Sequence, residues 1–139
     1  MPGARGLANG PRTDMFHREE EYRRGVDLFN SGKFWESHEA WEEIWQDDNR
    51  DERVFYQGLI QIAAAFVHHG TRNLRGMRKL LHEGIAKIEP FAPFHEGIDL
   101  DRLLDLLVRW RDALDAAPER MPEGLTIPQI ELEEREHRP

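Results

Sequence analysis

Residues 54–67 read VFYQGLIQIAAAFV, and apolar side chains occupy almost every side of the helix that this stretch predicts. A helix without a polar face lies in the middle of a fold, because no side of it prefers water. We therefore expect a long central helix over about 52–69, ended by Gly70. Three polar residues share one narrow stripe on it at 100° per residue: Gln57, Gln61 and His68.

Four further helices are expected from the 3.6-residue spacing of apolar positions, over about 14–30, 33–46, 72–89 and 100–117. Asp14, Thr71 and Asp99 are suited to cap three of them. The segments 47–51 and FAPFHEG at 91–97 are expected to be connecting loops, and no run shows the alternation typical of a sheet. The sequence therefore predicts an all-α protein, a compact bundle of about five helices around the central one.

The length of 139 residues suits one domain. Residues 1–13 are rich in Gly, Pro and Arg and are expected to be a disordered tail, residues 14–117 the helical domain, and residues 118–139 an extended arm with a solvated end. In the first helix, Tyr22, Val26 and Phe29 form the inward stripe, at spacings of four and three residues.

Composition excludes several classes of function. The chain has no cysteine, which removes disulfides and thiolate metal sites, and its formal net charge is −8, which argues against a nucleic-acid binder. The N-terminus has no apolar stretch of signal-peptide length, and the longest apolar run, Leu59 to Val67, is far short of a membrane span. A cytoplasmic protein without membrane contact is expected.

The second helix contains FWESHEAWEEIW at 34–45, with three of the four tryptophans of the chain. On a helical projection, Phe34, Trp35, Trp41 and Trp45 form an aromatic face with His38 at its centre, and the glutamates lie opposite. Glu42 falls at the edge between the two faces. This arrangement predicts that the second helix has one apolar side and one acidic side that faces water.

The polar stripes of the second and third helices are expected to face each other, because a buried amide or imidazole without a partner costs about 1–3 kcal/mol. Three interpretations remain open: a closed hydrogen-bond network, a ligand pocket, or a metal site on His38 and Glu42. The candidate pocket residues are His38, Glu39, Glu42, Trp45, Gln57, Gln61 and His68.

The function predicted from these residues is a small helical binding or assembly module for a small-molecule or peptide ligand. The alternative is a hydrolase-like or metal-dependent enzyme, with His38 as a general base oriented by Glu42. No cofactor and no tightly bound metal are expected, because the pair has no second His/Glu pair and no Glu-x-x-His motif beside it. His82 and His95 are interpreted as isolated surface residues.

A homodimer is also expected. The aromatic face of the second helix is wider than one neighbouring helix covers, and tryptophan is enriched at interfaces. A basic stripe of Arg72, Arg75 and Lys79 on the fourth helix complements the acidic face, and a two-fold axis would use such a pair twice. The same stripe is an alternative site for a phosphate group.

The stretches LFNSGKFWESHEAWEEIW at 28–45, FYQGLIQIAAAFVHH at 55–69 and GTRNLRGMRKLL at 70–81 resemble the bacterial and archaeal family called domain of unknown function 309. The resemblance covers about 22–88 and implies a compact all-helical fold around one long apolar helix, without an assigned activity. The residues that match the family pattern are Phe29, Asn30, Gly32, Phe34, Glu36, His38, Glu39, Glu42, Trp45, Gln57, Gly58, Leu59, Ile60, Gln61 and Asn73.

Overall fold

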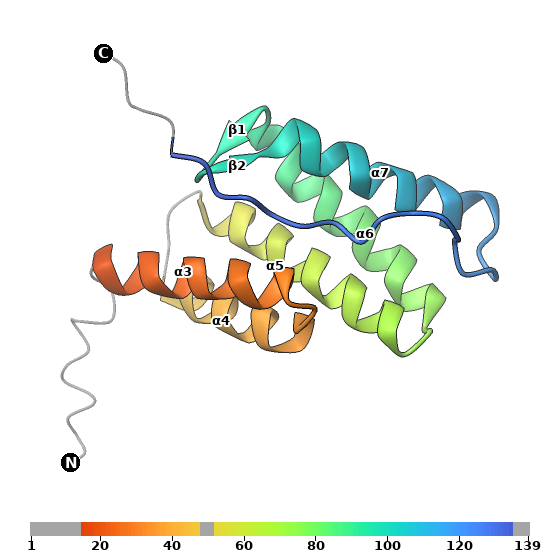
Figure 1. The fold of residues 1–139 in the computed structure, drawn as a ribbon, viewed down its shortest axis with the longest axis horizontal. Helices are drawn as coiled ribbons and strands as arrows, with labels where there is room; N and C mark the ends of the chain where they lie inside the picture. Colours follow the sequence, from red (N-terminus) through yellow and green to blue (C-terminus); the bar gives the residue numbers. More distant parts are fainter. Residues whose placement is uncertain (1–14, 48–51, 135–139) are drawn as a thin grey trace.

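A computed structural model of the chain describes residues 15–47 and 52–134. The all-α compact fold is confirmed, with five α-helices in this part of the chain (Figure 1). In chain order the elements are α3 (Met15–Asn30), α4 (Phe34–Asp47), α5 (Glu52–Gly70), α6 (Leu74–Ile88), the 3-10 helix η1 (Glu89–Phe91), β1 (Phe94–His95), β2 (Ile98–Asp99) and α7 (Leu100–Ala116). The expected Asp14 cap, the turn at 48–51 and both terminal tails lie outside the described residues.

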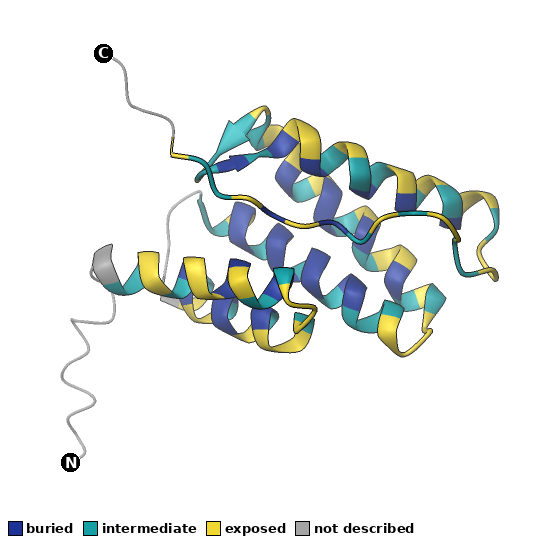
Figure 2. Cartoon of the chain, viewed as in Figure 1, coloured by how far each residue is buried: buried dark blue, intermediate teal, exposed yellow. Residues whose placement is uncertain are grey.

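Helix α5 packs against α4 on one side and against α6 on the other. Its apolar sequence explains this position, since both flanks and the inner face must be covered by protein. Figure 2 shows the buried residues of α5 continuing onto the facing sides of its neighbours. The buried residues of α5 are Phe55, Tyr56, Gly58, Leu59, Ile60, Ile62, Ala63, Ala65 and Phe66.

Helices α3 and α4 approach closely at Gly25. A Cβ atom at this position would lie 2.2 Å from Nε1 of Trp41, so only glycine leaves room for the indole. The Trp41 Nε1–H donates to the Tyr22 carbonyl at 3.2 Å, and the Ser37 hydroxyl donates to the Gly25 carbonyl at 2.9 Å. The expected inward stripe of α3, Tyr22, Val26 and Phe29, is buried against this contact.

Helices α5 and α6 also meet through glycine. A Cβ on Gly84 would lie 3.0 Å from the Gly58 carbonyl oxygen, and one on Gly58 would lie 3.2 Å from the Gly84 carbonyl oxygen. The two backbones are therefore near van der Waals contact at this crossing. Gly58 belongs to the stretch FYQGLIQIAAAFVHH quoted above. The close approach of α6 at this point explains why residue 58 is a glycine.

Helix α6 begins later than expected, and its cap is Asn73 instead of Thr71. The Asn73 side chain accepts a hydrogen bond from the Gly76 backbone N–H at 3.0 Å. The expected cap of α7 is confirmed, because the Asp99 side chain accepts from the Arg102 backbone N–H at 3.1 Å.

The expected loop at 91–97 is partly wrong, because its end forms a short antiparallel hairpin. Phe94 pairs with Asp99, and His95 pairs with Ile98. Glu96 and Gly97 make the turn with φ of 50° and 81°, and a turn of two positive φ values matches the twist of a two-residue hairpin. Two residues per strand are too few to show the alternation on which strand prediction depends.

Residues 118–134 contain no helix or strand and run back along the bundle (Figure 1). Asn30, the last residue of α3, binds both backbone groups of Ile130: its amide N–H donates to the carbonyl at 2.7 Å, and its amide oxygen accepts from the N–H at 2.7 Å. Ile130 is buried, and the Trp110 Nε1–H donates to the Thr126 carbonyl at 2.8 Å. This segment covers part of the core beside α3 and α7.

Candidate functional site

The aromatic face of α4 is centred differently from the prediction. Its buried side contains Ser37, Trp41 and Ile44, while His38 is half-buried at the margin. The reason is tertiary: α3 as well as α5 packs on α4, so the covered side is turned toward the α3 contact. The expectation that His38 is the centre of the buried face is therefore wrong.

The three tryptophans of α4 have three different environments. Trp41 is fully buried, Trp45 is half-buried beneath the Arg53 guanidinium, 4.4 Å from its ring centre, and Trp35 is 56% exposed. Two of the three tryptophans on which the dimer expectation depended are thus covered within one chain. Dimerisation stays a prediction, which sedimentation at micromolar concentration tests.

His38 and Glu42 of α4, and Gln57 and Gln61 of α5, are all half-buried.

The hydrogen bonds of these residues differ from the predicted closed network. His38 Nε2 lies 3.8 Å from Glu42 Oε2, too far for a hydrogen bond, and the Trp35 ring stacks on the imidazole with 5.0 Å between centroids. Gln61 Nε2 donates to Glu83 Oε1 of α6 at 3.1 Å. In the described part of the chain, His38 Nδ1 and Gln61 Oε1 are buried and have no hydrogen-bond partner.

His68 and Glu39 do not join this group. His68 Nδ1 lies 3.2 Å from the Asn73 amide nitrogen, so His68 supports the turn into α6. Glu39 is exposed and, with Glu42, lines an acidic cavity of about 530 Å³ between α3 and α4. The general base required by the enzyme alternative is not oriented here, because Glu42 does not reach His38 within hydrogen-bond distance.

The basic stripe of α6 is partly neutralised within the chain. Lys79 Nζ pairs with Glu83 at 2.9 Å, while Arg72 and Arg75 are exposed. Beside this stripe, Asp115 of α7 accepts hydrogen bonds from Arg78 Nε at 2.7 Å and from His82 Nε2 at 2.8 Å. His82 is therefore not isolated. The hydrogen bonds from His82 and Arg78 lower the pKa of Asp115.

We expect Asp115 to stabilise the fold only when it is ionised. Its pKa is lower in the folded chain than the ordinary 3.8, so the contribution is present above that value and is lost as the pH falls through the folded pKa. The pair is partly exposed, so the effect is at most about 1 kcal/mol and is screened by salt. Urea unfolding of wild type and Asp115→Asn at pH 7 and pH 3 measures it; an equal difference at both pH values would contradict the assignment.

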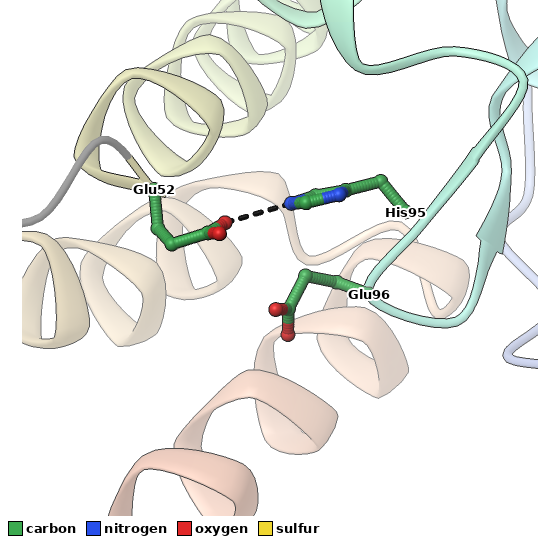
Figure 3. Close-up of side chains that lie close together, drawn as sticks. All are labelled: Glu52, His95 and Glu96. Carbon is green, nitrogen blue, oxygen red and sulfur yellow. Dashed lines mark hydrogen bonds and ion pairs between the residues drawn. The ribbon is translucent and has the colours of Figure 1, made fainter. Parts of the chain in front are cut away.

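A second cluster lies at the end of the bundle near the hairpin (Figure 3). His95 Nε2 lies 2.7 Å from Glu52 Oε1, and one ligand atom from each of Glu52, His95 and Glu96 lies within 4.8 Å of the others. The interpretation of His95 as an isolated surface residue is wrong. Sequence spacing carried no signal for this cluster, because 43 residues separate Glu52 from His95.

Tyr22 and Tyr56 stand beside this cluster with their rings edge to face, 5.9 Å apart. The Tyr22 hydroxyl donates to the Glu96 carbonyl at 2.6 Å. The pKa of Tyr22 is raised well above its ordinary value, chiefly by burial and to a smaller extent by the nearby Tyr56 and Glu96. The phenol therefore stays a neutral donor.

Comparison with known proteins finds a family match for the part of the chain that contains His38 and Gln61. Residues 22–80 match the family described as Domain of unknown function (DUF309). The match covers less than half of the chain. The DUF309 segment begins at Tyr22 in α3, contains all of α4 and α5 and ends within α6, so it includes His38 and Gln61 but not His95 or Glu96.

The chain is also similar to the "Uncharacterized protein YpuF" of Bacillus subtilis (strain 168). The two are 33% identical over 85 residues, which cover 59% of this chain and 49% of YpuF. The chain therefore matches about half the length of this relative. None of the described helices has the length and apolarity that a membrane span needs.

Proposed function

We propose that the DUF309 domain of this chain is a binding module that receives a cationic N–H donor, such as the guanidinium of an arginine side chain in a peptide. The proposed site is the half-buried stripe between α4 and α5. One observation carries the proposal: two buried atoms, His38 Nδ1 on α4 and Gln61 Oε1 on α5, have no partner among the described residues. Buried polar atoms are normally paired, so an unpaired set is a candidate contact for a ligand.

Both atoms are acceptors. The Gln61 amide nitrogen donates to Glu83, which leaves the amide oxygen as its unpaired end. In the tautomer that carries its proton on Nε2, the His38 imidazole presents Nδ1 as an acceptor. A ligand that presents two or more N–H donors complements this pair.

The surroundings favour a positive charge on that ligand. Glu42 and Glu83 stand beside the two acceptors, and the chain carries a formal net charge of −8. Trp35 is one of two large apolar side chains that the described residues expose, and its ring stacks on His38. An exposed indole over the site supplies a face for a cation and moves aside without disturbing the core.

The test is an NMR titration of 15N-labelled protein with N-acetyl-arginine amide. The uncharged isostere N-acetyl-citrulline amide is the matched ligand control. We expect shift changes on α4 and α5, and an apparent Kd at least about tenfold lower for the arginine ligand, since a charged donor strengthens each hydrogen bond. Trp35→Ala and Gln61→Leu should weaken binding, while Gln46→Leu, at an exposed glutamine of α4, should not. Equal affinity for both ligands would exclude the proposal.

Stability of Gln61→Leu separates a binding site from a structural network. The sequence predicts a loss of about 1–3 kcal/mol from a closed network. The structure changes that expectation to within about 1 kcal/mol of wild type, because the substitution also removes a buried unpaired oxygen and Glu83 keeps its Lys79 partner. Urea unfolding provides the measurement. A loss near 3 kcal/mol would show that the amide is fully satisfied in the folded protein.

A further inference from the structure

The geometry points to a binding site for a divalent transition-metal ion of the zinc class, formed by Glu52, His95 and Glu96. The three side chains come from the first residue of α5, from β1 and from the hairpin turn, and Figure 3 shows them close together, with Glu52 and His95 facing each other and Glu96 beside them. Two of the three lie outside the DUF309 segment. The site is therefore separate from the one proposed between α4 and α5.

The separations fit a metal. Zinc binds imidazole nitrogen and carboxylate oxygen at about 2.0–2.2 Å, which places tetrahedral ligand atoms about 3.4 Å from one another. The three candidate ligand atoms already lie within 4.8 Å of one another, and His95 Nε2 is 2.7 Å from Glu52 Oε1. Displacements of the ligand atoms on the order of an ångström would bring them to these separations.

Electrostatics also favours a cation. Glu52 and Glu96 place two carboxylates beside one imidazole. The side chains of His95 and Glu52 are each only 24% exposed, whereas Glu96 is exposed to water. A divalent ion at this point neutralises both carboxylates.

The ligands are held in place by their neighbours. The His95 ring contacts the rings of Phe55 and Phe91, each 4.7 Å away between centroids. Glu96 is held by its backbone carbonyl, which accepts the Tyr22 hydroxyl at 2.6 Å. Ligands fixed by second contacts bind metal at a smaller cost in side-chain entropy.

The donor set selects the class of ion. One imidazole nitrogen with two carboxylates suits zinc and its first-row neighbours, whereas magnesium and calcium prefer oxygen donors alone. Three protein ligands leave a fourth position for water, as in exchangeable or reactive zinc sites. Glu96 also lines a cavity of about 620 Å³ with Tyr22 and Tyr56, which gives the site access to solvent.

The experiment uses the full untagged chain, freed of metal by dialysis against a chelator. Titration with Co²⁺, followed by its visible absorption, and competition between Zn²⁺ and a chromophoric chelator give stoichiometry and affinity. We expect one equivalent of either ion, and at least tenfold weaker binding in Glu52→Gln, His95→Gln and Glu96→Gln. His82→Gln, which removes a histidine paired with Asp115, is the matched control and should bind as wild type does.

Circular dichroism checks that each variant remains helical, and amide shifts of the wild type on Zn²⁺ addition give a readout that needs no variant. Shifts confined to the start of α5 and the hairpin support the site. Absence of stoichiometric binding, retention of full affinity in all three variants, or shifts located elsewhere would overturn it. The arginine-ligand titration is an independent measurement, so failure of one proposal leaves the other standing.

Discussion

Replacing Trp41 by alanine is expected to lower the free energy of unfolding by about 3–5 kcal/mol, the usual cost of removing a large buried aromatic side chain. Trp41 is fully buried, with its ring 5.9 Å from the Phe29 ring between centroids. The substitution also removes the indole N–H that donates to the Tyr22 carbonyl. For a domain of this size, a loss of that magnitude is a large fraction of the total stability.

Trp35→Ala is the matched control, because it removes the same side chain from the same helix. Trp35 is 56% exposed, so its removal should change the unfolding free energy by less than about 1 kcal/mol. Urea unfolding followed by circular dichroism compares the two variants. Similar losses in both would contradict the assignment of Trp41 as the buried residue and Trp35 as the surface residue of α4.

Replacing Gly25 by alanine is expected to cost about 2 kcal/mol net. Over-packing in a close contact lowers the free energy of unfolding by up to about 3 kcal/mol. The better helix propensity of alanine offsets about 1 kcal/mol of this loss. The new Cβ would lie 2.2 Å from Nε1 and 2.5 Å from Cδ1 of Trp41, a rigid ring without free space around it. The helices must therefore separate to admit one methyl group.

Two further variants make this prediction specific. Gly70→Ala adds the same methyl group where no atom lies within 4 Å, and should be nearly neutral. In a Trp41→Ala background the clash disappears, so Gly25→Ala should become neutral or slightly stabilising. A double-mutant cycle measures this coupling. Additive losses would show that the cost at Gly25 arises from another contact.

The sequence correctly predicted features that depend on local spacing. The 3.6-residue pattern located the five helices, and the spacing of Tyr22, Val26 and Phe29 indicated the buried side of α3. Asp99 was identified as a cap because capping depends on residues within one turn. Thr71 was the wrong choice because Asn73, two residues later, is equally suited, and the turn between the helices decided between them.

The candidate site between α4 and α5 was only partly predictable. His38, Glu42, Gln57 and Gln61 are all half-buried in the structure. Their partners were not predictable, because Gln61 bonds Glu83 of α6 and His38 stacks with Trp35 of its own helix. A helical projection gives the direction of a side chain but not which of several neighbours it reaches.

The sequence by itself determined the all-α fold, the apolar α5 and the segment that matches the DUF309 family, because each depends on residues close together in the chain. Tertiary structure alone decided which tryptophan of α4 is buried, since that depends on where α3 packs. It alone also brought His95 to Glu52, because the hairpin folds back onto the start of α5. Contacts between distant residues depend on how the helices pack, and spacing along a single chain does not record that packing.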